Sequence, residues 1–497
     1  MINASNVYFK GLAFDRFFYG YLFLGALWGI ALFPGNPSTD VNVAIGLAQN
    51  GIIDSHGTVS FGIALYILTL GGKTIVLFGL FQFILFNFSL WFLLYTILGS
   101  RWAFRIMFYL ALLPLLMPIS WTHTHDIWAT SGFFIGLALC INPNLSQTRK
   151  PHSKHSRILL LVLSGLLVSM HFNIIFIATT LVMLVISSKV RFAAKFFPSQ
   201  IVSLGGLLVM LASSFFFTIA FALLIGTEAQ GNTNKYETDK YESHSRGILL
   251  ADLACISYLS DDSVKHLGNI RSSARDTLHA CDINFEGKYT SKYVKPYVEL
   301  STPDLATKWV YMIFKEPKNF IIGHYNRSWP IHAISVLPPY QTWSFNESLL
   351  PNPPKATQFH ATFLSAYDGN TLSRFDTKTN IYPSREDNLL FKVVQKPVGL
   401  WNQLLLLTGN AGFILLILLI FLYFTRAAVS LSVNSIFLRV VGIIYIANLI
   451  SLSIVSPAPE IRYTYPSLLL VYSLLSVLLH LFSLRFVQKV NFSRRLL

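Results

Sequence analysis

Charged residues are scarce in this chain, at 12% of 497 residues against the about 25% of a typical soluble domain. Hydrophobic residues make up 53% of the sequence. They recur in apolar runs of roughly 20 residues, the length that spans about 30 Å of hydrocarbon. This composition excludes an ordinary soluble protein and predicts an all-α polytopic membrane protein.

Several signature motifs are also missing. The sequence has no glycine-rich phosphate-binding loop, no HExxH zinc motif and no nucleophile elbow. A nucleotide site on the inner face is therefore not expected. Cysteine is scarce as well, and Cys140 lies in an apolar run. Cys255 and Cys281 could pair if their loop faces an oxidising compartment, and two unlinked thiols are the alternative.

The apolar runs predict ten helical membrane spans. They lie near residues 17–33, 74–98, 102–119, 127–142, 158–170, 173–187, 200–225, 400–424, 436–455 and 466–484. The stretch 59–70 is too short to span and is predicted to be a re-entrant or interfacial helix. The chain thus divides into an N-terminal membrane module (1–225) with a long first outer loop (34–73), an extracytoplasmic soluble domain of mixed structure (226–397) inserted before the last three spans, and a C-terminal membrane module (398–497).

Successive loops between the predicted spans lie on opposite sides of the membrane. Acidic residues are almost absent from the loops of one side. With the N-terminus inside, the inner segments contain 17 Lys/Arg and one acid, Asp15. The outer segment 226–397 is nearly neutral, with 19 Lys/Arg and 18 Asp/Glu. The net charge of +15 is therefore an inner-face excess, and no nucleic-acid partner is expected.

The remaining acids sit at the outer membrane edge, where ionisable residues are candidates for chemistry. These are Asp40, Asp54, Asp126 and Glu460. Asp40 follows a Pro-Gly-Asn-Pro turn and begins a predicted short helix. It is either a catalytic carboxylate or, like Thr39, a helix N-cap. Asp54 and His56 form a second polar cluster in the same loop.

A third cluster, SWTHTHD, ends at Asp126, where the fourth span starts. Imidazole and carboxylate groups both ligate divalent ions. His125 and Asp126, together with Asp40, could therefore hold Mg²⁺ or Mn²⁺, although the spacing is not that of a closed zinc site. The alternatives for Asp126 are substrate contact and a plain N-cap.

Two further segments carry polar groups. His171 and Asn173 interrupt an apolar stretch, where polar groups must find partners, and a short loop between half-spans is the simplest interpretation. Arg462 lies in the last outer loop between Glu460 and Tyr463. Arginine suits phosphate, and the alternative is an aromatic belt with a Glu–Arg pair. Lys73 is a second candidate phosphate partner, with snorkelling as the alternative.

These elements together resemble the GT-C superfamily of integral-membrane glycosyltransferases, and most of all its bacterial dolichyl-phosphate-mannose-type branch. The resemblance rests on four features. They are the first outer loop with Asp40, the Asp54-Ser55-His56 element, the junction from Pro118 to Asp126, and the element from Pro457 to Pro466. Two positions depart from the family pattern: Gly57 stands where many relatives have proline, and His125 where many have lysine.

The resemblance implies inverting transfer of a sugar from a polyprenyl-phosphate donor lipid. The acceptor would be a glycan, lipid or protein at the outer face of the plasma (bacterial inner) membrane. Asp40 would be the general base, and Arg462 and Lys73 would offset the phosphate charge. The other predicted substrate contacts are Asp54, His56, His125, Asp126, Glu460 and Tyr463. A transporter or flippase of a lipid-linked saccharide is the alternative, but the scarcity of charge near the span centres favours an enzyme.

Overall fold

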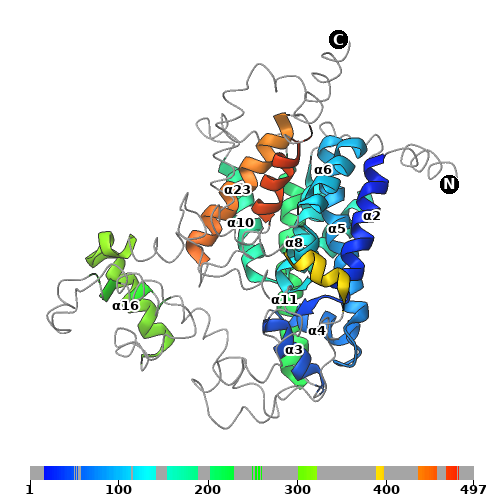
Figure 1. Ribbon diagram of the computed structural model, residues 1–497. Coiled ribbons are helices and arrows are strands. Elements are labelled where there is room, and N and C mark those ends of the chain that lie inside the picture. Colours follow the sequence, from blue (N-terminus) through cyan, green and yellow to red (C-terminus); the bar gives the residue numbers. More distant parts are fainter. Residues whose placement is uncertain are drawn as a thin grey trace.

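The computed structural model is mostly helical in the part it describes (Figure 1). The described residues are 16–37, 39–49, 51, 53, 58–113, 116–141, 154–187, 202–228, 249, 252–253, 256–257, 259, 300–321, 388–396, 435–455, 466–477 and 480. Two helices, Val76–Leu98 and Leu204–Phe221, are long and apolar enough to cross a membrane by length and composition.

The helices follow the predicted apolar runs closely. They are α2 (Arg16–Leu32), α3 (Thr39–Gln49), α4 (Val59–Leu68), α5 (Val76–Leu98), α6 (Ser100–Leu112), α7 (Leu116–Trp121), α8 (His125–Cys140), α9 (Lys154–Val168), α10 (Phe172–Ser187), α11 (Leu204–Glu228), α16 (Thr302–Lys315) and α23 (Ser435–Val455). A further apolar helix covers Pro466–Val477. The predicted run 400–424 lies outside the described residues, and the predicted short helix 59–70 is present as α4.

The third predicted span, 102–119, is wrong as one continuous helix. It is divided into α6 and α7. Helix α6 ends at Leu112, and the backbone of the next residue, Leu113, is extended with φ −72° and ψ 123°. Pro114 follows, and proline disfavours the helical conformation in the residue before it. The break brings α7 and the segment after it into the site described below.

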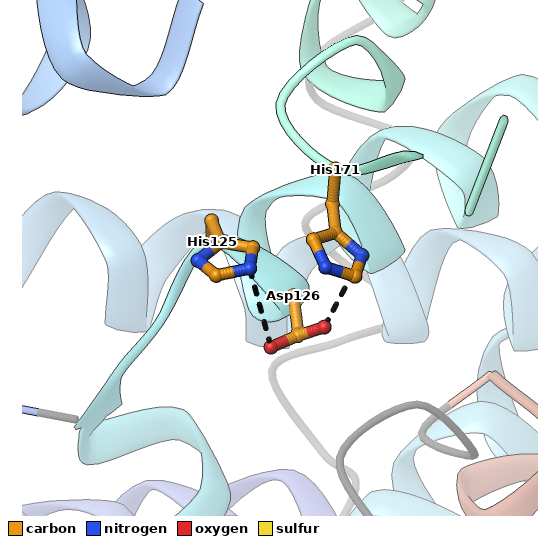
Figure 2. Close-up of side chains that lie close together, drawn as sticks. All are labelled: His125, Asp126 and His171. Carbon is orange, nitrogen blue, oxygen red and sulfur yellow. Dashed lines mark ion pairs between the residues drawn. The ribbon is translucent and has the colours of Figure 1, made fainter. Parts of the chain in front are cut away.

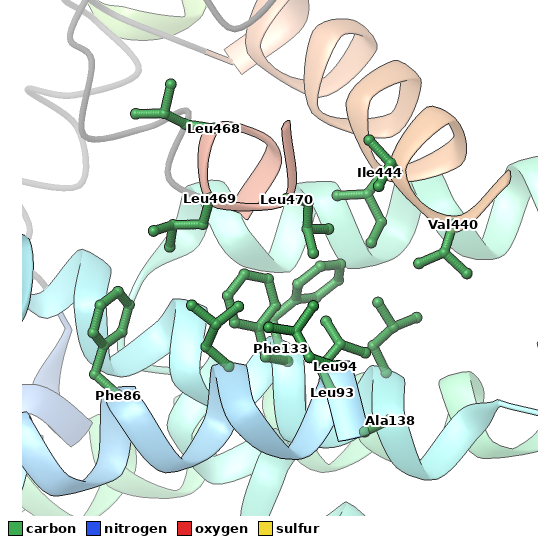
Figure 3. Packing of buried hydrophobic residues seen from close by; sticks show 14 of the residues in the cluster. Phe86, Leu93, Leu94, Phe133, Ala138, Val440, Ile444, Leu468, Leu469 and Leu470 are labelled. Carbon is green, nitrogen blue, oxygen red and sulfur yellow. The ribbon is translucent and has the colours of Figure 1, made fainter. Parts of the chain in front are cut away.

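Helix α8 is central to the packing. It contacts α5 and α9, while α11 packs on α9 and α10 packs on α23. A large apolar core joins these helices to the C-terminal ones. Phe86, Leu93 and Phe133 face Ile444 and Leu469 across it (Figure 3). Helices from the N-terminal and C-terminal parts of the chain therefore share one core.

Glycines let α8, α9 and α11 approach closely, as small residues commonly do in membrane helix pairs. Gly132 and Gly136 of α8 face α9, and Gly136 also faces α11. At Gly165 of α9, a Cβ atom would lie 2.5 Å from the Met210 carbonyl oxygen of α11. A backbone oxygen cannot move aside as a flexible side chain can, so position 165 does not accommodate even a methyl group.

Gly165→Ala is therefore expected to destabilise the protein by about 1–3 kcal/mol, the usual cost of overpacking. Thermal unfolding of the purified variant in detergent measures the change. Gly205→Ala is the matched control, because nothing lies within 4 Å of a Cβ atom at Gly205. Equal melting temperatures for the two variants would contradict the close approach of α9 and α11.

The first loop folds back against the start of α8. Its strand β1 (Asn36–Pro37) pairs in parallel with β2 (Thr122–His123), with Asn36 opposite Thr122. A second apolar cluster joins Ile45 of α3 and Phe61 of α4 to Trp128 of α8. The loop 34–73 and the α7–α8 junction, both predicted to be outer, thus lie together.

Gly35 makes this approach possible. Its φ of +105° is in the left-handed region that favours glycine. A Cβ atom there would lie 2.6 Å from the Trp121 carbonyl oxygen and would also overlap the His123 ring. A side chain at position 35 would therefore push β1 away from β2.

Described parts of the segment 226–397 include α16 and helical residues between 249 and 259. Trp309 of α16 donates a hydrogen bond from Nε1 to Oδ2 of Asp252, at 2.9 Å. Further along, Asn388 donates to the carbonyl oxygen of Ile30 near the end of α2, at 3.1 Å. The chain therefore returns from this segment at the same end of α2 from which the first loop departs.

Candidate functional site

The structure brings together two of the predicted site residues, His125 and Asp126, and adds His171 to them (Figure 2). Lys73 is exposed before α5, and Asp40 is the second residue of α3. The side chain of Asp40 lies outside the described part. So do the other predicted residues, which are Asp54, His56, Glu460, Arg462 and Tyr463.

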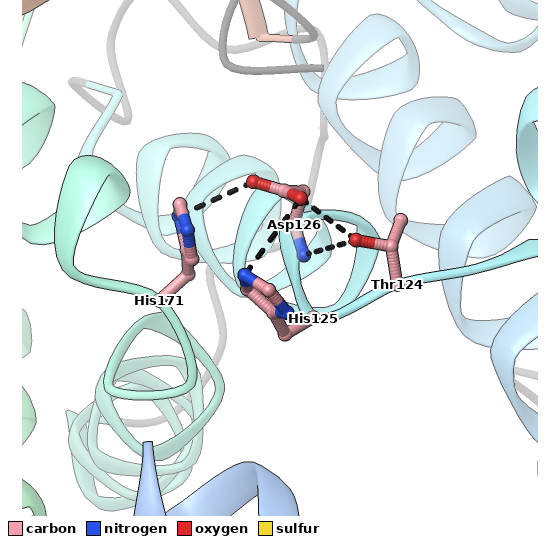
Figure 4. Close-up of polar contacts among 4 residues, drawn as sticks. All are labelled: Thr124, His125, Asp126 and His171. Atoms are coloured by element: carbon pink, nitrogen blue, oxygen red, sulfur yellow. Dashed lines mark hydrogen bonds and ion pairs between the residues drawn. The ribbon is translucent and has the colours of Figure 1, made fainter. Parts of the chain in front are cut away.

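Thr124 precedes α8 and forms two hydrogen bonds with Asp126. Its extended backbone, with φ −158° and ψ 148°, is that of an N-cap, and its side chain accepts a hydrogen bond from the Asp126 amide at 3.3 Å. Its hydroxyl donates to Oδ2 of Asp126 at 2.7 Å (Figure 4). The N-cap is therefore Thr124, and the interpretation of Asp126 as the cap is wrong. In the first loop, α3 begins at Thr39, and Asp40 is its second residue. The capping alternatives for these two residues fall on side chains outside the described part.

Gln82 of α5 fixes the segment that leads into α8. Its amide nitrogen donates to the carbonyl oxygens of Ser120 at 3.1 Å and Thr122 at 2.9 Å. Its side-chain oxygen accepts from Nε1 of Trp128 at 3.0 Å. All these groups are buried, so one side chain joins α5, β2 and α8 at the site.

Gln82→Leu is expected to lower the free energy of unfolding by at least about 2 kcal/mol, since it leaves buried carbonyls and an indole N–H without their partner. Thermal unfolding in detergent and near-ultraviolet circular dichroism of the tryptophans test this. Ser89→Ala on the same helix is the control. Ser89 donates to the Phe86 carbonyl within its own helix. A Gln82→Leu variant as stable as Ser89→Ala would disprove the structural role of Gln82.

The three side chains of the cluster converge on one carboxylate. Nδ1 of His171 lies 3.3 Å from Oδ1 of Asp126, and Nε2 of His125 lies 3.9 Å from Oδ2. The two imidazole ring centroids are 4.3 Å apart. Asp126 is 0% exposed, His125 5% and His171 8%. Figure 2 shows both rings directed at the carboxylate from different segments of the chain.

His171 reaches the cluster from the break between α9 and α10. The predicted pair of short helices is present, and the expectation that polar groups at this break find partners is confirmed for His171 by its pairing with Asp126. Ser169, two residues earlier, donates to the hydroxyl of Ser60 in α4 at 2.9 Å. The break is thus fixed to both α8 and the first loop.

His123 takes no part in the cluster, although it is two residues from His125. Its ring packs edge-on against Phe78, with centroids 5.2 Å apart. A Cβ atom on Gly79 would lie 3.0 Å from its Nε2, so the ring fills the space between β1 and α5. The His-x-His-Asp run is therefore split between a packing histidine and a histidine of the polar cluster.

The burial of Asp126 determines what the cluster can do. Burying a carboxylate is unfavourable unless it is paired and hydrogen-bonded. The Thr124 hydroxyl provides a hydrogen bond, and the two imidazoles provide positive charge when they are protonated. Such a group can orient a hydroxyl, pass a proton or hold a cation, since the three ligand atoms lie within 4.8 Å of one another.

Comparison of the chain with family models, with curated proteins and with solved structures returns no match. The functional argument therefore rests on the geometry of the cluster and on the sequence pattern around it.

Proposed function

We propose that this protein is a polytopic membrane glycosyltransferase that moves a sugar from a polyprenyl-phosphate donor to an extracytoplasmic acceptor. The ten-span arrangement, with both termini inside, is part of the proposal. So are the GT-C relationship and the location of the site at the outer face of a bacterial inner membrane. The acceptor belongs to the class of glycans, lipids or proteins reached from that face.

The observation that carries the proposal is the buried cluster of His125, Asp126 and His171 at the point where the first loop meets α8. Ionisable groups among apolar helices are energetically unfavourable, and they usually mark a functional site. The β1–β2 pairing places the first loop, which contains Asp40, against the same junction. The loop that contains the Asp40 carboxylate thus lies next to a buried polar cluster. This arrangement supports a reaction at the membrane surface, on a substrate whose lipid tail lies among the helices.

The proposed reaction is a single displacement. The acceptor hydroxyl oxygen attacks the anomeric carbon, the bond from that carbon to the phosphate oxygen breaks, and the configuration inverts. Asp40 takes the hydroxyl proton as general base. Arg462 and Lys73 offset the charge of the lipid phosphate as it leaves. Asp126 and the two histidines orient the acceptor.

The test is a transfer assay in proteoliposomes. Polyprenyl-phosphate sugars with a labelled sugar are supplied with a candidate acceptor. Release of free polyprenyl phosphate in step with labelling of the acceptor supports the proposal. If the protein releases no lipid phosphate from any donor and glycan acceptors stay unlabelled, the proposal fails.

Transport of a lipid-linked saccharide is the second candidate, and one observation favours it. A carboxylate that is 0% exposed beside two buried histidines resembles the proton relays of membrane transporters. The same proteoliposomes distinguish the two functions. A transporter moves the labelled donor between leaflets with its sugar–phosphate bond intact, whereas the enzyme cleaves that bond on one side.

A further inference from the structure

We propose that His125, Asp126 and His171 form a binding site for one divalent transition-metal ion, Zn²⁺ or Mn²⁺. The site goes beyond the proposed sugar transfer and does not depend on it. Its new element is His171, which comes 45 residues after Asp126 in the sequence and meets it only in the folded protein.

The ligand atoms of the three residues lie within 4.8 Å of one another, which is close enough for small side-chain rotations to place them around one ion. Bonds of about 2.0–2.1 Å in tetrahedral geometry separate neighbouring ligand atoms by about 3.4 Å. The two imidazole nitrogens lie 3.3 and 3.9 Å from the carboxylate oxygens that they face. A hydrogen bond between nitrogen and oxygen usually spans about 2.7–3.2 Å. The His125 distance is too long for a direct hydrogen bond. A small rotation of the ring would bring this nitrogen to the spacing of two ligands of one ion.

The ligand types select the class of ion. Two imidazoles and one carboxylate are the donors that Zn²⁺, Mn²⁺ and other transition ions accept. Mg²⁺ prefers oxygen ligands and retains several waters, which does not suit two imidazoles in a buried position. The residues therefore favour Zn²⁺ or Mn²⁺ over Mg²⁺.

The surroundings support an ion as well. A divalent cation balances the charge of Asp126, which is otherwise unfavourable in a position with 0% exposure. The Thr124 hydroxyl donates to Oδ2 of Asp126 at 2.7 Å and so orients the carboxylate, as partners of metal ligands commonly do. Figure 4 shows this hydroxyl on the far side of the carboxylate from His171. Three protein ligands leave a coordination position for an oxygen of a bound molecule.

The site is held by contacts from several elements. His125 and Asp126 are fixed by the start of α8 and by the β1–β2 pairing next to it. His171 is fixed by the break between α9 and α10, where Ser169 bonds to Ser60 of α4. The ligands thus belong to elements that pack on one another, which favours a defined coordination geometry.

The experiment uses the full chain, purified in detergent, stripped with a chelator and titrated with MnCl₂ or ZnCl₂. Electron paramagnetic resonance follows bound Mn²⁺, and a chromophoric chelator competes for Zn²⁺. We expect one ion per chain for the wild type and an affinity lowered roughly 10–100-fold or more in His171→Ala and His125→Ala. His480→Ala is the matched control and should bind like the wild type, since His480 is also a buried histidine but packs against Phe17 of α2 and Trp102 of α6.

A ligand exchange shows direct coordination. His171→Cys, loaded with Co²⁺, should show a thiolate-to-cobalt charge-transfer band in the near ultraviolet that the wild type lacks. A wild type that binds no ion, an unchanged affinity in both alanine variants, or a cysteine variant without the band would each overturn the proposal. No sugar donor is present in these measurements, so their failure would leave the proposed glycosyl transfer untouched.

Discussion

Asp126→Asn is expected to lower sugar transfer at least about 100-fold while the melting temperature stays the same or rises. Misplacing a reacting group by about 1 Å already costs that much rate. Asparagine has nearly the shape of aspartate, so the Thr124 contact can persist, but it removes the negative charge that faces His125 and His171. A buried carboxylate is itself unfavourable, so removing the charge need not destabilise the fold.

Transfer assays in proteoliposomes and thermal unfolding in detergent measure the two effects. Asp252→Asn is the matched control, because Asp252 is also a buried carboxylate but accepts its hydrogen bond from Trp309, in the segment 226–397. This control should retain transfer. If Asp126→Asn instead lost stability and kept its rate, Asp126 would be a structural residue only.

Asp40→Asn is expected to reduce transfer about 10²–10⁴-fold, the usual contribution of a general base. The variant should retain donor binding and membrane insertion, because the substitution leaves the apolar contacts of α3 in place. Buried Val41, Ala44 and Ile45 provide those contacts. The acid limb of the pH–rate profile should also disappear, since that limb reports protonation of the base.

Two further variants in α3 separate the role of the Asp40 carboxylate from that of the helix position. Asp40→Glu keeps a carboxylate and should retain part of the rate. Gln49→Ala removes the hydrogen bond from Gln49 to the Gly72 carbonyl, at 3.0 Å, and tests the positioning of α3 without touching the base. Full activity of the Asp40→Asn variant would contradict the assignment of Asp40 as the general base and would indicate that another outer carboxylate is the base.

The sequence predicted most of the described helices because apolar run length is a strong signal. Helix α5 (Val76–Leu98) and α11 (Leu204–Glu228) follow their predicted runs of 74–98 and 200–225 within a few residues. The break between α6 and α7 was missed because hydropathy is continuous across it. Pro114 was the available signal, since it forces Leu113 out of the helix.

The site was predictable in part. The residue types at His125 and Asp126 indicated chemistry, and the break at His171 indicated a polar group in need of a partner. The partner itself could not be read from the sequence, because the pairing of residues 126 and 171 depends on how α8 and α9 pack. The interpretation of Asp126 as the N-cap failed for a local reason: threonine and aspartate both cap helices well, and the residue with the extended backbone before α8 is Thr124.

The position of the cluster along the chain has a consequence for biosynthesis. Its residues, and the loop that covers it, lie between residues 34 and 173, in about the first third of the 497 residues. Translation proceeds from the N-terminus, and early parts of a chain can fold before later parts are made. The polar cluster can therefore assemble in the nascent chain before the segment 226–397 has been synthesised. Helix α23, which packs on α10, is synthesised later and packs against helices that have already assembled.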